Sequence, residues 1–114
     1  MADCLFCRIV AGEIPAKVVR RSADAVAFTD INPQAPVHVL VIPTRHVAAV
    51  RAAGADDEGM LGRTLAFTAD VARELGLDAG GYRIVTNTGP DAGQSVDHLH
   101  FHLLGGRRLG WPPG

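Results

Sequence analysis

The sequence has no long hydrophobic run, no excess of charge of either sign and few cysteines. No apolar stretch approaches the roughly 18 residues that a membrane-spanning helix needs. The N-terminus also lacks the basic and apolar regions of a signal peptide, so we expect a cytoplasmic protein. The net charge of -1 gives no electrostatic footprint for nucleic acid or an anionic membrane. These absences argue against a membrane-spanning protein and a nucleic-acid-binding one.

The chain does contain enough apolar sequence for one packed domain. Of its 114 residues, 47% are hydrophobic and 20% are charged, which is typical of a globular protein and not of a disordered one. A domain of this length buries roughly two-thirds of the surface that its unfolded chain exposes, so a second domain would not fit. The sequence contains no internal repeat and no low-complexity segment. We therefore expect a single domain over residues 1–114.

Hydrophobic periodicity and turn-forming residues predict short strands and two helices. The longest element is a helix over residues 57–75, capped by Asp56 or Asp57 and ended by Gly76 in the left-handed conformation. Its expected buried face consists of Leu61, Leu65, Thr68, Val71, Ala72 and Leu75. The other segments are helical turns over 4–11, strands over 17–21 and 25–30, a loop over 30–36, strands over 38–43 and 82–87, a loop over 87–95, a strand through His98, His100 and His102, and an irregular tail.

Three of the five histidines, His98, His100 and His102, occupy every second position of the last expected strand. On a β-strand they point to one face, while the apolar residues between them point to the core. Imidazole populates both protonation states near neutral pH, so such a cluster suits metal binding, nucleophilic attack or proton transfer, although an inward histidine is also commonly structural. The preceding Gly-Gln-Ser segment at 93–95 offers neutral hydrogen-bond donors, which favours an anion site.

A phosphorus atom held by these donors would lie before the face that carries His100. The neutral ring nitrogen could attack in line and form a phosphohistidine, which water would then release. Backbone N–H groups and the side chains of Gln94 and Ser95 could stabilise the transition state without a metal. His102 and His38 would bind the phosphate or orient the nucleophile, and Ser95 or a neighbouring imidazole would relay a proton to a departing amine.

Four motifs resemble those of the histidine triad proteins. The segment at 98–104, His-Leu-His-Phe-His-Leu-Leu, matches the His-φ-His-φ-His-φ-φ signature of that family, where φ is apolar. The resemblance to the nucleotide-binding branch, called Hint, continues in Gly-Gln-Ser at 93–95, Asp-Ile-Asn-Pro-Gln-Ala-Pro at 30–36 and Gly-Gly-Arg-x-x-x-Trp-Pro-Pro-Gly at 105–114. It implies a homodimer with an α+β fold: an antiparallel sheet of about five strands, one long helix, a short N-terminal helix and a tail over 104–114 that reaches the partner.

The resemblance also implies an activity, the hydrolysis of the P–N bond in purine nucleoside 5′-phosphoramidates. The reaction would pass through a nucleotidyl intermediate on His100 and release AMP or GMP, with no catalytic metal and no organic cofactor. By position in the motifs, His38 and His102 are supporting histidines, Asp30 holds the ribose hydroxyls and Trp111 reaches toward the partner's site. The phosphate would be contacted by Asn87, Gly93, Gln94 and Ser95, and the base by Phe6, Ile9, Phe28 and Ile31. An alternative is that Phe6, Ile9 and Phe28 only form core and that Asp30 only caps a turn.

The Cys-x-x-Cys motif of Cys4 and Cys7 has no part in this chemistry. In a reducing compartment it favours metal binding or redox chemistry over a disulfide. Two thiolates and two imidazoles make a closed tetrahedral zinc site of the structural type. His46 is otherwise unexplained and His98 is the triad histidine least needed for chemistry, so we expect these four residues to bind a structural zinc, as in some bacterial-type Hint proteins. The alternative is that both cysteines are reduced core thiols.

Three other functions compete with the phosphoramidase. The first is a nucleotide-binding or regulatory module in which turnover is incidental. The second, within the same family, is hydrolysis of dinucleoside polyphosphates, against which the short Trp-Pro-Pro-Gly tail argues. The third is a catalytic metal site on His98, His100 and His102, which predicts that added metal raises the rate.

Overall fold

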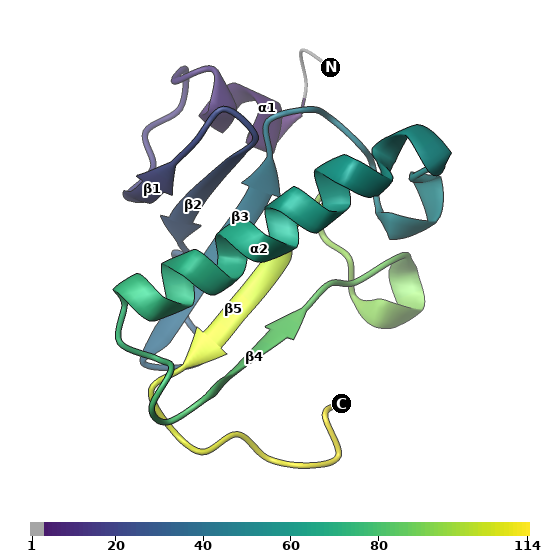
Figure 1. Cartoon of the computed structure of the whole chain (residues 1–114). Helices are drawn as coiled ribbons and strands as arrows, with labels where there is room; N and C mark the ends of the chain where they lie inside the picture. The colour runs from purple at the N-terminus through teal and green to yellow at the C-terminus, as the bar shows by residue number, and fades with distance from the viewer. Residues whose placement is uncertain (1–3) are drawn as a thin grey trace.

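The computed structural model describes residues 4–114. Its elements are α1 (Leu5–Val10), β1 (Val18–Arg21), β2 (Ala25–Thr29), β3 (Val37–Pro43), α2 (Glu58–Glu74), β4 (Tyr82–Val85) and β5 (Phe101–Gly105), with 3-10 turns η1 (Val50–Ala52), η2 (Ala55–Asp57) and η3 (Pro90–Ala92). The five strands form one antiparallel sheet in the order β1-β2-β3-β5-β4 (Figure 1). The expected α+β fold, with one long helix and a short N-terminal helix, is confirmed. None of the helices in this part of the chain has the length and apolarity to cross a membrane.

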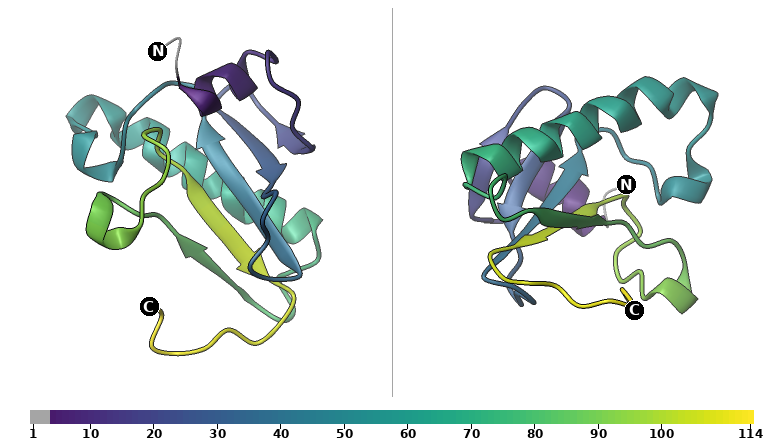
Figure 2. Two further views of the ribbon diagram at one scale, coloured as in Figure 1. Left: turned by 180° about the vertical axis from the view of Figure 1, so that it is seen from behind. Right: turned by 60° about the horizontal axis from the view of Figure 1, so that its bottom comes forward.

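Helix α2 crosses one face of the sheet and closes the larger core (Figures 1 and 2). Its buried side chains include Phe67, Val71 and Ala72, which pack on alternate residues of the central strands. The strand side of this core is formed by Ala25, Ala27, Val39, Val41, Phe101 and Leu103. Phe101 and Leu103, which alternate with the histidine side of β5, therefore point into this core, as expected.

Helix α1 packs against the opposite face of the sheet. Phe6 and Ile9 of α1 are buried with residues of β2 and β3, namely Val26, Phe28, Leu40 and Ile42. A six-residue helix is too short to be stable alone, so this packing and its N-terminal cap hold it. The cap is the Sγ of Cys4, which accepts the Cys7 N–H at 3.3 Å. The sheet thus has a structural face under α2 and a second face for α1 and the histidines.

The expected strand through all three triad histidines is wrong at its start. Strand β5 begins at Phe101, so only His102 lies within it. The ladder pairs Phe101 with Val41 of β3, and continuing it would bring Leu99 opposite Pro43. Because proline has no N–H to donate, the ladder cannot extend that far. The chain turns away instead, and the N–H of Leu99 donates to Val47 O.

The expected buried face of the long helix is also partly wrong. Leu65 is 47% exposed and Leu75 lies at the surface, whereas Phe67 is 7% exposed. Two threonines belong to the buried stripe because their hydroxyls donate to carbonyls one turn earlier: Thr64 to Met60 O at 2.8 Å and Thr68 to Thr64 O at 2.9 Å. Burying these hydroxyls therefore leaves no unpaired polar group. At the helix end, Gly76 has a φ of 76°, as expected.

Candidate active site

His100 lies just before β5 and is 4% exposed. Its Nδ1–H donates to the carbonyl oxygen of His98 at 2.7 Å. In a neutral imidazole only one nitrogen carries a proton, so this bond leaves the lone pair on Nε2. The backbone of His100 is also held, because Thr86 Oγ1 donates to its carbonyl at 2.9 Å. The residue expected to be the nucleophile thus presents an unprotonated Nε2.

His38 and His102 meet across the β3–β5 pair. His38 lies opposite Leu104 and His102 lies opposite Leu40, so the two histidines are diagonal neighbours on one sheet face. Their Nε2 and Nδ1 atoms are 2.9 Å apart. Strand parity places residues of one strand on a common face, but the register that brings the rings of two strands together comes from the fold.

The backbone at Gln34 decides which of these two rings donates. The Gln34 N–H donates to Nδ1 of His38 at 3.0 Å, so the proton of the neutral His38 ring lies on Nε2. That Nε2–H donates to Nδ1 of His102, with Oδ2 of Asp30 3.4 Å away as a further acceptor. His102 must then carry its own proton on Nε2. The site therefore combines a lone pair on His100 with an N–H on His102, whose ring centroids are 5.1 Å apart.

Burial keeps the supporting histidines uncharged. Desolvation, together with the neighbouring His100 and His38, lowers the pKa of His102 to about 4 against the opposing effect of Asp30. Desolvation also lowers the pKa of His38, again opposed by the carboxylate of Asp30. Both rings are consequently neutral near pH 7, and the chain of hydrogen bonds from Gln34 through His38 to His102 persists there.

A mainly apolar cavity of about 530 Å³ lies beside α1. All five residues that the sequence assigned to the ribose and base line this cavity: Phe6, Ile9, Phe28, Asp30 and Ile31. Ile31 is fully exposed, whereas Phe6 and Phe28 are almost completely buried. Sequence reasoning did not identify the further lining residues Leu5, Ile14, Lys17 and Leu40. The common parity of His38 and Leu40 on β3 was the available signal for Leu40.

The loop that follows β4 contains the residues expected to contact a phosphate. Gly93 has a φ of 81°, a left-handed conformation that favours glycine. Gln94 uses its side chain within the loop: its Oε1 accepts the Gly89 N–H, and its Nε2 donates to Ala48 O and Val96 O. Asn87 is half-buried and Ser95 is exposed. Contact of these residues with a phosphate stays a prediction.

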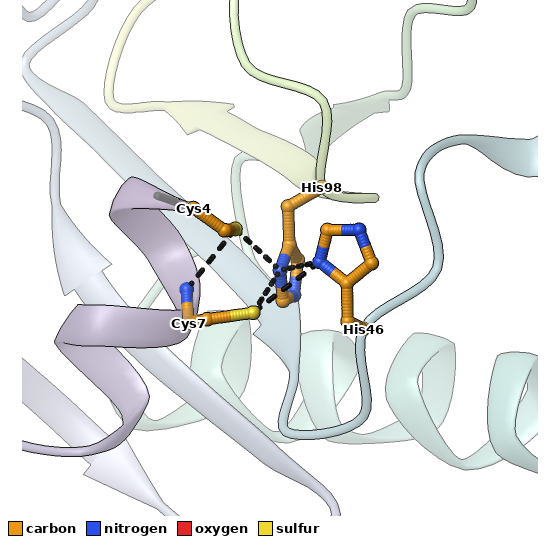
Figure 3. A group of neighbouring side chains, drawn as sticks. All are labelled: Cys4, Cys7, His46 and His98. Carbon is orange, nitrogen blue, oxygen red and sulfur yellow. Dashed lines mark hydrogen bonds between the residues drawn. The ribbon is translucent and has the colours of Figure 1, made fainter. Parts of the chain in front are cut away.

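A second cluster joins Cys4 and Cys7 with His46 and His98 (Figure 3). Nδ1 of His98 lies 3.3 Å from Cys4 Sγ, 3.5 Å from Cys7 Sγ and 3.1 Å from Nδ1 of His46, which in turn lies 3.3 Å from Cys7 Sγ. The buried Nε2–H of His98 donates to Pro43 O at 3.0 Å, so its Nδ1 lone pair faces the sulfurs. Burial and the neighbouring Cys4 raise the pKa of the Cys7 thiol. These four residues could bind a metal.

The remaining histidine sets suit a metal less well. Nδ1 of His98 points at the cysteines and Nδ1 of His100 at a carbonyl, so the three triad rings do not direct their lone pairs at one point. Asp30, His38 and His102 do bring ligand atoms within 4.8 Å of one another. However, Gln34 fixes the proton of His38 on the nitrogen that would have to bind the ion.

The C-terminal tail runs back past β4 (Figure 2). Its backbone is held there because Arg83 Nη2 donates to Gly110 O at 2.9 Å. The guanidinium of Arg83 also lies over the ring of Trp111, 5.7 Å from its centroid, and Trp111 is 80% exposed. The structure therefore brings Trp111 to the edge of the sheet, and its contact with a partner's site stays a prediction.

Comparison with known proteins gives consistent matches along the chain. The sequence model of one protein family, the HIT domain, matches residues 11–109. An uncharacterized HIT-like protein from Synechococcus elongatus is 49% identical over 112 residues, covering 98% of this chain and 97% of that protein. A crystal structure of a HIT family hydrolase from Legionella pneumophila is 47% identical with a TM-score of 0.96, over 98% of this chain and 100% of that one. A histidine triad nucleotide-binding protein from Candida albicans is 36% identical with a TM-score of 0.82, over 96% of this chain and 83% of that one.

Proposed function

Because the chain belongs to the HIT domain family, we propose that it is a hydrolase, and specifically a purine nucleoside phosphoramidase. One observation carries the proposal: His100 presents a lone pair on Nε2 while the adjacent neutral His102 presents an N–H. The first is a nucleophile toward phosphorus, and the second is a hydrogen-bond donor to a phosphoryl oxygen. The relative from Legionella pneumophila, described as a hydrolase, supports this reaction class.

In the first step, Nε2 of His100 attacks the phosphorus atom and the P–N bond breaks. The bonding electrons leave with the amine, which takes a proton through Ser95 or a neighbouring imidazole. The ring of His100 becomes cationic as the new P–N bond forms. The carbonyl of His98 stabilises that charge because it already accepts the Nδ1–H at 2.7 Å.

In the second step, water attacks the phosphorus and returns a proton to the group that protonated the amine. The bond to His100 breaks, its electron pair returns to Nε2, and the nucleoside monophosphate is released. The Nε2–H of His102, oriented by His38, stabilises the charge on the phosphoryl oxygens in both steps. Asn87, Gly93, Gln94 and Ser95 supply further donors to the phosphate. The nucleoside occupies the cavity beside α1, with Asp30 on the ribose hydroxyls and the base among Phe6, Ile9, Phe28 and Ile31. Trp111 of a homodimer closes the partner's site.

The metal held by Cys4, Cys7, His46 and His98 is in this proposal a structural zinc. A tetrahedral zinc with Zn–N near 2.0 Å and Zn–S near 2.3 Å would put two nitrogens about 3.3 Å apart, a nitrogen and a sulfur about 3.5 Å apart and two sulfurs about 3.8 Å apart. The distances of 3.1 to 3.5 Å in the cluster agree with this spacing. Bound there, zinc supplies folding energy and no step of the reaction. Elemental analysis of zinc-loaded, dialysed protein should find one zinc per chain, and finding none would contradict this assignment.

The decisive assay is hydrolysis of an adenosine 5′-phosphoramidate by the wild-type protein and by His100→Ala. We expect turnover by the wild type and loss of turnover in the variant, with AMP binding retained as the check that the site remains folded. Equal rates, or a zinc-loaded wild type that is active only when further metal is added, would overturn the mechanism. The relative from Candida albicans, described as nucleotide-binding, favours a binding module as the second candidate. Tight AMP binding without turnover of phosphoramidates or dinucleoside polyphosphates would support that candidate.

A further inference from the structure

Helix α1 lies between the metal cluster and the nucleophile. Cys4 and Cys7 at its start belong to the cluster (Figure 3), while Phe6, between them in sequence, is buried toward the sheet. The ring of Phe6 meets His100 edge to face, with centroids 5.1 Å apart and planes at 88°. It makes a similar contact with His98 at 5.9 Å. One aromatic side chain thus touches both a cluster residue and the nucleophile.

His98 provides a second connection between the two sites. Its Nδ1 faces both cysteines, and its own carbonyl oxygen accepts the Nδ1–H of His100. That bond is the one that leaves the lone pair of His100 on Nε2. Anything that fixes His98 therefore also fixes the acceptor that sets the tautomer of the nucleophile.

The cluster adds to the few anchors that hold α1, a helix too short to be stable alone. The helix has six residues, about half the length at which an isolated helix becomes even marginal in water. Its first residues belong to the cluster, and the exposed Leu5 adds little burial. Its other anchors are the apolar contacts of Phe6, Ile9 and Val10 with the sheet and a hydrogen bond that Arg21 Nη1 donates to Val10 O at 3.2 Å.

We propose that the metal cluster positions the nucleophile, acting through Phe6 and through the carbonyl of His98. Phe6 is a positioning residue: its ring, perpendicular to that of His100, fixes the plane of the His100 ring, and bound zinc fixes Phe6 by fixing α1. The inference rests on the proposed function above, because it concerns His100 as the group that attacks phosphorus. It goes beyond a stabilising role for the metal, since it links metal occupancy to the geometry of a second site.

The test compares Phe6→Leu and Phe6→Tyr in the zinc-loaded protein with Phe67→Leu as the matched control. Phe67 is equally buried, but it lies in the core under α2, on the other face of the sheet. Leucine at position 6 keeps an apolar wall for the nucleoside and removes the aromatic ring that packs against His100. We expect kcat to fall about tenfold in Phe6→Leu, with KM changed by less than about threefold, because a misplaced reacting group costs rate more than binding. Phe6→Tyr, which keeps an aromatic ring, should retain the kcat of the wild type, and so should Phe67→Leu.

A spectroscopic measurement separates positioning from activity. At one fixed pH, a histidine-labelled NMR spectrum of zinc-loaded protein should contain a slowly exchanging Nδ1 proton of His100. That proton should exchange rapidly after zinc is removed with a chelator, and also in zinc-loaded Phe6→Leu, while Phe67→Leu retains it. The same protection in all four samples, or a kcat for Phe6→Leu equal to that of Phe67→Leu, would overturn the inference. A wild type without turnover would refute the proposed function alone, since the proton exchange still reports the positioning.

Discussion

Three of the five histidines hold one ring nitrogen against a backbone group, and these bonds decide what the other nitrogen can do. His98 donates to Pro43 O, His100 donates to the carbonyl of His98, and His38 accepts the N–H of Gln34. All three are histidines, yet His98 is suited to bind a metal, His100 to attack phosphorus and His38 to donate a hydrogen bond to His102. Backbone groups therefore assign the roles that the alternating motif leaves open.

The neutral state of His102 predicts a pH dependence of stability. Its pKa is about 4 in the folded protein, below the ordinary value of 6.5, so the unfolded chain binds more protons between these values. The free energy of unfolding should therefore fall as the pH drops from about 6.5 toward 4. The full shift corresponds to about 3 kcal/mol, and partial exposure of the ring reduces it to roughly 1–2 kcal/mol. Urea unfolding at a series of pH values measures the slope.

His102→Asn is the matched variant for that slope, because it removes the titrating ring and keeps a polar side chain. We expect the variant to lose less stability than the wild type between about pH 6.5 and pH 4, whatever its stability at neutral pH. Parallel curves for the two proteins would show that His102 is not the group responsible.

At this scale the sequence predicts which side chains gather but not how they are bonded. The alternation of the triad indicated one face for its histidines, and all five residues assigned to ribose and base line one cavity. The tautomers could not be predicted, because the Gln34 N–H and the Pro43 carbonyl reach the rings only after the chain has folded. For the same reason, the sequence treated Gln94 as a phosphate ligand without indicating that its side chain also braces the loop.

At the scale of elements, helix α2 shows that leucine spacing alone does not identify the buried face of a helix. Leucine spacing predicted a face that includes Leu65, but the helix buries Phe67 and two threonines whose hydroxyls bond to its own backbone. Phe67→Ala should therefore destabilise the protein by about 3–4 kcal/mol, and Leu65→Ala by less than about 1 kcal/mol. Denaturant unfolding of both variants decides the matter, and similar losses would contradict the assigned face.

The N-terminal helix depends on residues far away in the sequence. His46 supplies one ligand of the metal cluster from the segment after β3, and it is only half-buried, so its removal should leave no large cavity. We expect His46→Ala to bind less than one zinc per chain and to lose the rise in Tm that zinc gives the wild type. Thermal unfolding with and without zinc measures this. An undiminished zinc-dependent rise in the variant would remove His46 from the site.

At the scale of the whole molecule, one edge of the sheet is strand β4. β4 pairs with β5 on one side, and the exposed Trp111 lies beside it over Arg83. Open strand edges and exposed aromatic rings are features that proteins cover by association. They are consistent with the homodimer that the tail motif led us to expect.

Mixed dimers test whether the tail serves the partner's site. His100→Ala and Trp111→Ala homodimers should both be impaired, the first in kcat and the second in KM. In a mixed dimer, the subunit with an intact His100 receives the intact tail of its partner, so one fully competent site should return. Sedimentation first establishes the dimer, and exchange of subunits then gives the assay. Failure of the mixture to regain activity would place Trp111 against its own subunit's site.

The order of the elements could be predicted from the sequence more completely than the points where strands end and chain segments turn. The order of strands and helices, the loop over 30–36 and the left-handed Gly76 are set by local periodicity and turn residues. The early end of the β3–β5 ladder depends on Pro43 meeting a segment more than 50 residues later, which no local pattern specifies. The three 3-10 turns were missed because each is a single turn without a hydrophobic period.

The central claim is that His100 carries the nucleotide between the two steps. Its most direct test is to mix the protein with an adenosine 5′-phosphoramidate, stop the reaction within one turnover and analyse the peptides by mass spectrometry. The quench is alkaline because a phosphorus–imidazole bond is labile in acid. We expect an adenylyl group on the peptide that contains His100, formed and lost at rates consistent with kcat and absent from His100→Ala. Turnover without that adduct, or an adduct on another residue, would contradict it.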